Sequence, residues 1–133
     1  MSLPVANPLR VLLVEDSRAD AAFAEHALEV SDGAFEVTIT GSLDAGIDRL
    51  ADGFDAILLD LTLPDSAGPE TVVRMRAAAR ALPIVVLTSA EGDAIADRCM
   101  RAGADAYRQK GRLSPTELGD VLSRTIARGH WRP

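Results

Sequence analysis

The sequence predicts an α/β protein whose core is an open, doubly wound parallel sheet of five strands with five helices. Strand-like and helix-like segments alternate along the 133 residues, at intervals of roughly 20–25 residues. The runs 11–14, 56–59 and 84–87 are apolar throughout, which indicates strands buried on both faces. A chain of this length usually forms one domain, which we expect to span 9–128, with tails at both ends. Helices on both faces of a parallel sheet account for these observations.

The first strand is predicted at 9–14, after a short tail at the N-terminus (1–8) that contains two prolines. Ser17 then offers an N-cap for a helix, with an aspartate three residues later in the manner of a capping box. Phe23, Ala27 and Val30 recur at helical spacing and predict the apolar face of this helix.

The middle of the chain continues the same alternation. Alternating polarity predicts a strand at 35–40, and a stripe of leucine and isoleucine predicts a helix that starts near Leu43 and stops at Gly53. A second buried strand follows at 56–59. After a loop, Pro69 is a natural first residue for a helix through Arg80.

The last third of the chain contains two further strand–helix units. The buried strand 84–87 precedes a helix on which Ile95, Cys99 and Ala102 face one way and which Gly103 ends. A short strand is predicted at 104–108. The final helix begins at 114–117, with an N-cap serine, an N1 proline and an N3 glutamate, and residues 129–133 are expected to be a tail or a linker stub.

Composition excludes several classes of protein. The 14 basic and 20 acidic residues give a net charge of −6, so bulk attraction to nucleic acid or to an anionic membrane is not expected. No apolar run approaches the roughly 18 residues of a membrane span. The one cysteine, Cys99, cannot form an internal disulfide. We therefore expect a cytoplasmic domain that is a monomer or a weak dimer.

Polar residues stand where four of the predicted strands end. Glu15 and Asp16 follow the first strand, Asp60 follows the third, Thr88 the fourth and Lys110 the fifth. In an open α/β sheet, functional groups gather beyond the carboxyl ends of the strands, so we expect these side chains to converge. A single acid at such a position is usually solvated or caps the next helix, but the joint pattern predicts a site.

The chemistry of this set indicates phosphoryl transfer. Three carboxylates at one point repel one another without a counter-charge, and their oxygens suit a hard cation such as Mg²⁺. Lys110 is the only lysine among 14 basic residues. It is either a remnant of an arginine-rich composition or a position that needs a compact ammonium. Charge neutralisation and positioning are what phosphoryl transfer requires.

Four segments resemble the receiver domain of bacterial two-component response regulators. They are 11–16 (VLLVED), 57–64 (ILLDLTLP), 86–90 (VLTSA) and 107–110 (YRQK), in the order and spacing of that family. The resemblance implies the flavodoxin-like (βα)5 receiver fold and a signalling domain rather than an enzyme. It implies a sensor histidine kinase or a histidine phosphotransfer protein as phosphoryl donor, and a downstream effector domain or protein as the recipient of the signal.

The resemblance also implies a role for each site residue. Asp60 would be the phosphoacceptor. Glu15, Asp16 and Asp60 would hold Mg²⁺ together with the backbone carbonyl of Thr62, and Lys110 would pair with the phosphoryl oxygens.

A second group of residues is implied in switching and timing. Thr88 would move towards the phosphoryl group, and Tyr107 would turn inward as the readout on the output face. Thr62 and Ala90, two residues beyond Asp60 and Thr88, are expected to tune the lifetime of the phosphoryl group.

The chain departs from the family pattern after its lysine. Gly111 stands where the family usually has proline, so we predict a trans bond between Lys110 and Gly111, with positive φ at the glycine as the way to redirect the chain. Arg108 and Gln109 place polar groups where the fifth strand is often apolar, which changes the output surface. Asp65, in the loop after the phosphoacceptor, is expected to be solvated.

Three alternative functions compete with this one. A haloacid-dehalogenase-type phosphatase needs a second acid two residues after its nucleophile, where this chain has Thr62. A flavodoxin-like FMN binder needs a hydroxyl-rich phosphate loop, where this chain has the acidic pair Glu15 and Asp16. The remaining alternative is a degenerate receiver that acts as a phosphorylation-independent binding module.

Overall fold

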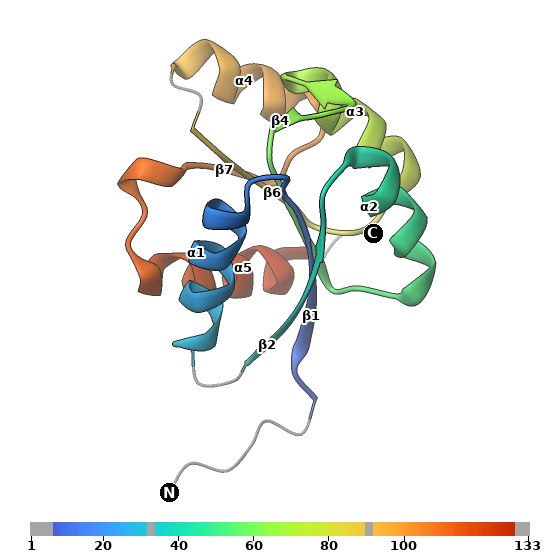
Figure 1. The fold of residues 1–133 in the computed structure, drawn as a ribbon. Coiled ribbons are helices and arrows are strands. Elements are labelled where there is room, and N and C mark those ends of the chain that lie inside the picture. Colours follow the sequence, from blue (N-terminus) through green and yellow to red (C-terminus); the bar gives the residue numbers. More distant parts are fainter. Residues whose placement is uncertain (1–6, 32–33, 90–91, 130–133) are drawn as a thin grey trace, which may run out of the picture.

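The protein is described by a computed structural model that covers residues 7–31, 34–89 and 92–129. Figure 1 shows a central sheet with helices packed around it. The strands are β1 (Leu9–Val14), β2 (Phe35–Thr40), β3 (Ala56–Leu59), β4 (Thr62–Leu63), β5 (Ser66–Ala67), β6 (Ile84–Thr88) and β7 (Ala106–Gln109). The helices are α1 (Arg18–Glu29), α2 (Leu43–Arg49), α3 (Pro69–Ala78), α4 (Asp93–Ala102) and α5 (Pro115–Gly129), with short 3₁₀ segments η1 (Leu50–Asp52) and η2 (Lys110–Arg112).

Five strands form a single parallel sheet in the order β2-β1-β3-β6-β7. Strand β1 lies between β2 and β3, so the direction in which the chain winds across the sheet reverses beside it. In open α/β sheets, this reversal leaves a crevice at the carboxyl ends of the strands, where ligands bind. The predicted fold class is therefore confirmed, and the crevice lies between the ends of β1 and β3.

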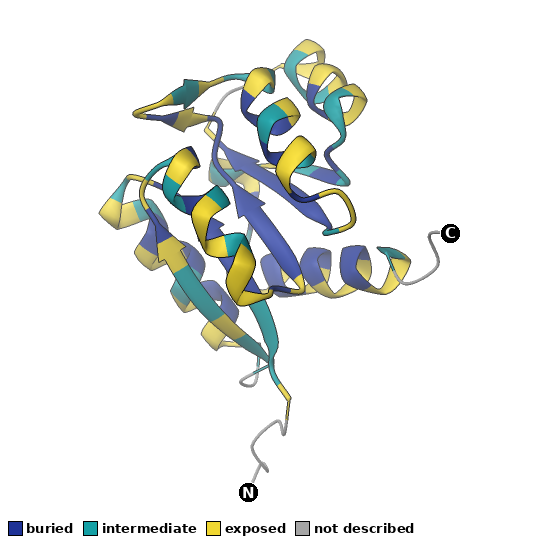
Figure 2. Cartoon of the chain, turned by 90° about the vertical axis from the view of Figure 1, so that its right-hand side faces the viewer, coloured by how far each residue is buried: buried dark blue, intermediate teal, exposed yellow. Residues whose placement is uncertain are grey.

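Each face of the sheet has its own apolar cluster. On one face, Leu58 of β3 shares a cluster with Leu28 of α1 and Leu122 of α5. On the other face, Leu59 shares a cluster with Met75 of α3 and with residues of α2 and α4. Figure 2 shows the middle of the sheet as buried and the edge strand β2 as partly exposed, and the covering helices keep their outer sides exposed. No helix within the described ranges has the length and apolar character needed to cross a membrane.

The buried face of α1 differs from the predicted one. Phe23 and Val30 keep 38% and 47% of their surface exposed, whereas Ala27 is fully buried. The residues that face the core are Ala21, Ala24, Ala27 and Leu28. Alanines let α1 lie close to its neighbours, and close packing decides which side of a helix is buried. The stripe of larger side chains was therefore a poor guide to the rotation of this helix.

The fifth strand of the sheet begins later than predicted. β7 spans Ala106–Gln109 instead of 104–108, because Ala104 and Asp105 belong to the turn after α4. That turn starts at Gly103, whose φ of 119° is a left-handed conformation that glycine adopts easily.

The segment between β3 and α3 contains a hairpin where a loop was predicted. Strands β4 and β5 pair antiparallel, and the backbone N–H of Gly68 donates to the carbonyl of Leu61 at 2.8 Å. The hairpin gives a defined shape to the chain directly after Asp60. Helix α3 begins at Pro69, as predicted, and ends at Ala78, two residues earlier than predicted.

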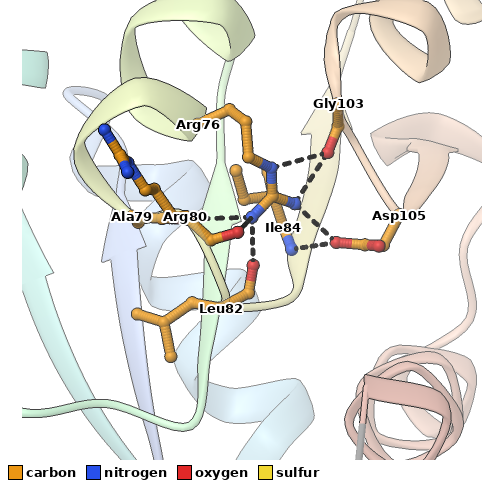
Figure 3. A network of polar contacts seen from close by, with 7 residues as sticks. All are labelled: Arg76, Ala79, Arg80, Leu82, Ile84, Gly103 and Asp105. Carbon is orange, nitrogen blue, oxygen red and sulfur yellow. Dashed lines mark hydrogen bonds and ion pairs between the residues drawn. The ribbon is translucent and has the colours of Figure 1, made fainter. Parts of the chain in front are cut away.

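Arg76 ties three parts of the chain together at the amino end of β6, the end of the sheet opposite the crevice (Figure 3). Its guanidinium pairs with the Asp105 carboxylate at 2.8 Å, and the same carboxylate oxygen accepts from the backbone N–H of Ile84 at 2.9 Å. The side chains of Arg76 and Asp105 are 18% and 5% exposed. The carbonyl oxygens that accept from Arg76 are those of Ala79, Arg80, Leu82 and Gly103.

Candidate functional site

Two acidic residues follow the carboxyl ends of the neighbouring strands β1 and β3. The backbone N–H of Glu15 donates to the carbonyl of Thr40 at 2.9 Å, and that of Asp60 donates to the carbonyl of Val14 at 3.1 Å. Both residues thus continue the hydrogen bonding of the sheet beyond the strands, which holds their backbones in place. Glu15 and Asp60 are 4% and 5% exposed, whereas Asp16 is exposed.

The sheet brings the three predicted carboxylates together. One carboxylate oxygen from each of Glu15, Asp16 and Asp60 lies within 4.8 Å of the others. The Oδ1 atom of Asp60 also accepts from the backbone N–H of Leu61 at 2.8 Å, and the Oε2 atom of Glu15 accepts from the N–H of Ser17 at 3.3 Å. These local bonds orient the two buried carboxylates.

Burial of acidic groups at this point has an electrostatic cost. Burial, reinforced by the contact with Asp60, raises the pKa of Glu15 to about 7, although Lys110 acts in the opposite direction. Partly buried carboxylates that crowd one another favour a bound cation, and a set of carboxylate oxygens suits a hard divalent ion. The donors present therefore fit the predicted Mg²⁺.

Lys110 directly follows the carboxyl end of β7, and its side chain reaches this cluster. Its Nζ donates to Oε1 of Glu15 and, at 2.9 Å, to Oδ2 of Asp20, and it lies 3.5 Å from Oδ2 of Asp60. Burial works to lower the pKa of Lys110, but the hydrogen bonds to Glu15 and Asp20 and the charges of the carboxylates raise it overall. The ammonium therefore stays charged near neutral pH, as the predicted role requires.

Asp20 is a fourth carboxylate that sequence reasoning did not assign to the site. It was expected only to complete the capping box of α1, and its N–H does donate to Oγ of Ser17 at 3.3 Å. Its carboxylate instead accepts a hydrogen bond from Lys110, and the backbone N–H of Ser17 donates to Glu15. The available signal was its position: an acid in the first turn of a helix that directly follows a strand ending in acids.

Three of the remaining predicted residues lie on β4, β6 and β7. Thr88 is the last residue of β6 and is fully buried. Tyr107 of β7 packs half-buried against the apolar cluster on the α2–α4 side of the sheet, and burial raises the pKa of its phenol. Thr62 begins β4, two residues beyond Asp60, and its side chain is exposed. Ala90 lies outside the described residues. Its role stays a prediction, and so does the role of the Thr62 carbonyl as a metal ligand.

The loops beside the site correct two details of the prediction. Asp65 is exposed, as expected, but its carboxylate is bound: Oδ1 and Oδ2 accept at 2.9 Å from the backbone N–H groups of Leu43 and Asp44. No cis peptide bond occurs in the described residues, so the bond between Lys110 and Gly111 is trans, as predicted. Gly111 does not have positive φ, however, because the 3₁₀ turn η2 redirects the chain here.

Comparison with known sequences gives a consistent result. The family model of the response regulator receiver domain matches residues 11–122. Two-component response regulator ORR41 of Oryza sativa subsp. japonica is 32% identical over 119 residues, which cover 87% of this chain and 93% of that protein. Cell cycle response regulator CtrA of Brucella ovis is 38% identical over 121 residues, which cover 90% of this chain and 49% of that protein. The chain thus spans about half the length of the latter relative.

Comparison with solved structures supports the fold. A CheY-like response regulator receiver domain protein from Methanospirillum hungatei JF-1 matches with a TM-score of 0.81 at 23% identity. The match covers 93% of this chain and 98% of that one. At this level of identity the likeness concerns the fold alone.

Proposed function

This chain belongs to the response regulator receiver domain family, and we propose that it is a phosphoacceptor whose Asp60 takes a phosphoryl group from a sensor histidine kinase or a histidine phosphotransfer protein. One observation carries the proposal: the buried Asp60 has its Oδ2 atom 3.5 Å from Nζ of Lys110 and shares a cluster within 4.8 Å with two other carboxylates. A nucleophilic carboxylate, a cation-binding set and a nearby ammonium are the parts that phosphoryl transfer needs.

In the proposed reaction, a carboxylate oxygen of Asp60 attacks the phosphorus of phosphohistidine and forms an O–P bond. The P–N bond breaks, and its electron pair stays on the ring nitrogen. Because the other ring nitrogen carries a proton, the imidazole leaves as a neutral ring and no oxidant or further proton donor is required. The N–H of Leu61, which binds Oδ1 of Asp60 at 2.8 Å, keeps the carboxylate oriented for this attack.

Positive charge beside the nucleophile stabilises the transferred group. We propose that the ammonium of Lys110 pairs with the phosphoryl oxygens, since it already lies within reach of the Asp60 carboxylate. The hydroxyl of Thr88, at the end of the adjacent strand β6, is proposed to donate to the same oxygens after phosphorylation. Both groups stand at the carboxyl ends of neighbouring parallel strands, and this common edge of the sheet supports the proposal.

The acidic cluster is proposed to hold Mg²⁺ through Glu15, Asp16 and Asp60, with the backbone carbonyl of Thr62 as a further ligand. When bound, Mg²⁺ would neutralise negative charge as the phosphoryl group approaches the carboxylates. The contribution of the chain is to keep these carboxylates close despite their repulsion, through the backbone bonds that extend β1 and β3.

The signal is proposed to leave through the edge of the sheet that carries Tyr107. Movement of Thr88 towards the phosphoryl group would open space for Tyr107. Tyr107 belongs to β7 and pairs with Val86 of the neighbouring strand β6. Thr62 and Ala90 are proposed to tune the lifetime of the phosphoryl group. The recipient is a downstream effector domain or protein in the cytoplasm, a reducing compartment that suits the unpaired Cys99.

A small acyl-phosphate donor tests the proposal directly. The purified chain is incubated with acetyl phosphate and Mg²⁺, and intact mass is recorded over time. We expect a gain of one phosphoryl group that is absent in Asp60→Asn and is prevented by EDTA. Asp48→Asn, an exposed aspartate of α2, is the matched control and should label like the unmodified chain.

Normal labelling of Asp60→Asn would contradict the assignment of the phosphoacceptor. Absence of labelling in the unmodified chain, both with acetyl phosphate and with a phosphorylated histidine phosphotransfer protein, would instead favour a phosphorylation-independent binding module.

A further inference from the structure

The ammonium of Lys110 is held by two carboxylates that are not the phosphoacceptor. Its hydrogen bonds run to Glu15 and, at 2.9 Å, to Asp20, whereas the nearest oxygen of Asp60 is 3.5 Å away. An ammonium has three N–H donors, and two of the three are used by these bonds. Lys110 is therefore engaged mainly outside the carboxylate that it is proposed to serve.

Asp20 differs from the other acids of the site in position and exposure. Its side chain is 45% exposed, compared with 3% for Glu15 and 6% for Asp60. It does not belong to the three-carboxylate cluster that fits a cation. Among the described residues, the one side chain that its carboxylate contacts by a hydrogen bond or an ion pair is that of Lys110. Any role of the Asp20 carboxylate in the site must therefore act through Lys110.

The surroundings leave Lys110 room to move. A pocket of about 310 Å³ lies beside it and is lined by Asp20, Phe23, Leu87, Lys110 and Gly111. A Cβ atom placed on Gly111 would meet no atom within 4 Å, so the chain next to the lysine is not tightly packed. Because the bond to Asp20 faces this open side, it can be broken without disturbing the core.

We propose that Asp20 is a positioning residue that competes with phosphorylated Asp60 for the ammonium of Lys110. The inference rests on the proposed function, because it requires Asp60 to carry a phosphoryl group. Phosphorylation adds negative charge and three acceptor oxygens at Asp60, which attract Lys110 and repel the nearby Asp20 carboxylate. The bond between Lys110 and Asp20 therefore opposes the phosphorylated state.

This competition has a measurable consequence for any phosphoryl-like ligand. Removing the negative charge of Asp20 leaves Lys110 with Glu15 and the ligand as partners, so the ligand should bind more tightly. Since half-exposed ion pairs contribute little, the expected gain in affinity is about two- to five-fold. Asp20→Glu keeps the carboxylate and should return the affinity towards that of the unmodified chain.

The test is a calorimetric titration of the chain with beryllofluoride, a phosphoryl mimic, at saturating Mg²⁺. The variants are Asp20→Asn, Asp20→Glu and, as a matched control, Asp93→Asn, which removes an exposed acid from the first turn of α4. Thermal unfolding shows whether all four proteins are folded alike. In the unmodified chain, the ¹³C resonance of the Asp20 carboxyl should shift on titration as its lysine partner leaves.

The outcomes separate this inference from the function on which it rests. Tighter binding by Asp20→Asn alone, together with the carboxyl shift, supports the competition. Equal or weaker binding by Asp20→Asn, in a chain that still binds the mimic, overturns it and leaves the proposed function intact. A gain of the same size in Asp93→Asn also overturns it, because the effect would then come from net charge. If the unmodified chain neither binds the mimic nor accepts a phosphoryl group, both this inference and the proposed function are overturned.

Discussion

Asp65 shows how one side chain can join two elements beside the site. It lies on the hairpin that follows Asp60, and its carboxylate accepts from Leu43 and Asp44, the first two residues of α2. The Oγ atom of Ser42 accepts from a third N–H of this helix. The bonds from Asp44 and Leu43 favour the charged carboxylate and hold the pKa of Asp65 below its ordinary value of 3.8.

We expect Asp65→Ala to lower the free energy of unfolding at pH 7 relative to the unmodified chain. A carboxylate whose folded-state pKa is lowered contributes stability above its unfolded-state pKa, and this contribution is lost as pH falls through the folded-state pKa. The difference between the two proteins should therefore shrink below about pH 4. Urea unfolding at several pH values measures it, with Asp48→Ala, an exposed acid of α2, as control. A difference that does not change with pH would mean that the charge of Asp65 is not responsible.

At the scale of elements, Arg76 is the main polar connection between α3 and the turn before β7 (Figure 3). A planar guanidinium can serve several acceptors at once, and here two of them are the carbonyls of Ala79 and Gly103, the residues that cap the carboxyl ends of α3 and α4. Two bonds run to Gly103, which ends α4, and one runs to Asp105 at the start of the next segment.

Arg76→Ala should lower the free energy of unfolding by about 3 kcal/mol, because it leaves the buried Asp105 carboxylate without its cation. This value is at the lower end of the range for buried pairs, since Arg76 keeps 18% of its side chain exposed. Urea unfolding provides the measurement. Arg101→Ala, at an exposed position in the last turn of α4, should change stability by less than about 0.5 kcal/mol. A loss below about 1 kcal/mol in Arg76→Ala would show that solvent replaces these bonds.

At the scale of the whole molecule, a chain of net charge −6 concentrates three acids at one edge of its sheet. Repulsion within this cluster opposes folding, and a cation that binds only the folded state would relieve it. The proposed Mg²⁺ site should therefore be coupled to the stability of the entire domain.

We expect Mg²⁺ to raise the midpoint of thermal unfolding in a saturable manner. At a free concentration one hundred times Kd, the stabilisation is about 2.7 kcal/mol. The midpoint is recorded against MgCl₂ concentration, with NaCl at equal ionic strength as reference and EDTA to reverse the effect. Glu15→Gln, which removes one proposed ligand with little change of size, should reduce the shift. The same shift in NaCl would indicate screening of charge instead of a cation site.

The sequence by itself determined where the chemically active residues stand along the sheet. Glu15 and Asp60 directly follow apolar runs, and residues at the same edge of a parallel sheet must lie close together. Lys110 could be assigned to the same edge because the alternation of elements places it after the last strand. In a strand, successive side chains point to opposite faces of the sheet, so the position of a residue along the strand already defines the face to which its side chain points.

Only the tertiary structure decided which helix residues join Glu15, Asp60 and Lys110 at the site. Asp20 and Lys110 are 90 positions apart, and their contact depends on the rotation of α1 about its own axis. The sequence pattern pointed to Phe23 as part of the buried face, whereas the alanines pack closest and Phe23 stays partly exposed. The side chain of Asp65 was likewise captured by the start of a helix 21 positions away. A helix can turn about its axis at little local cost, so contacts from distant segments set its rotation and select which of its polar residues reach the site.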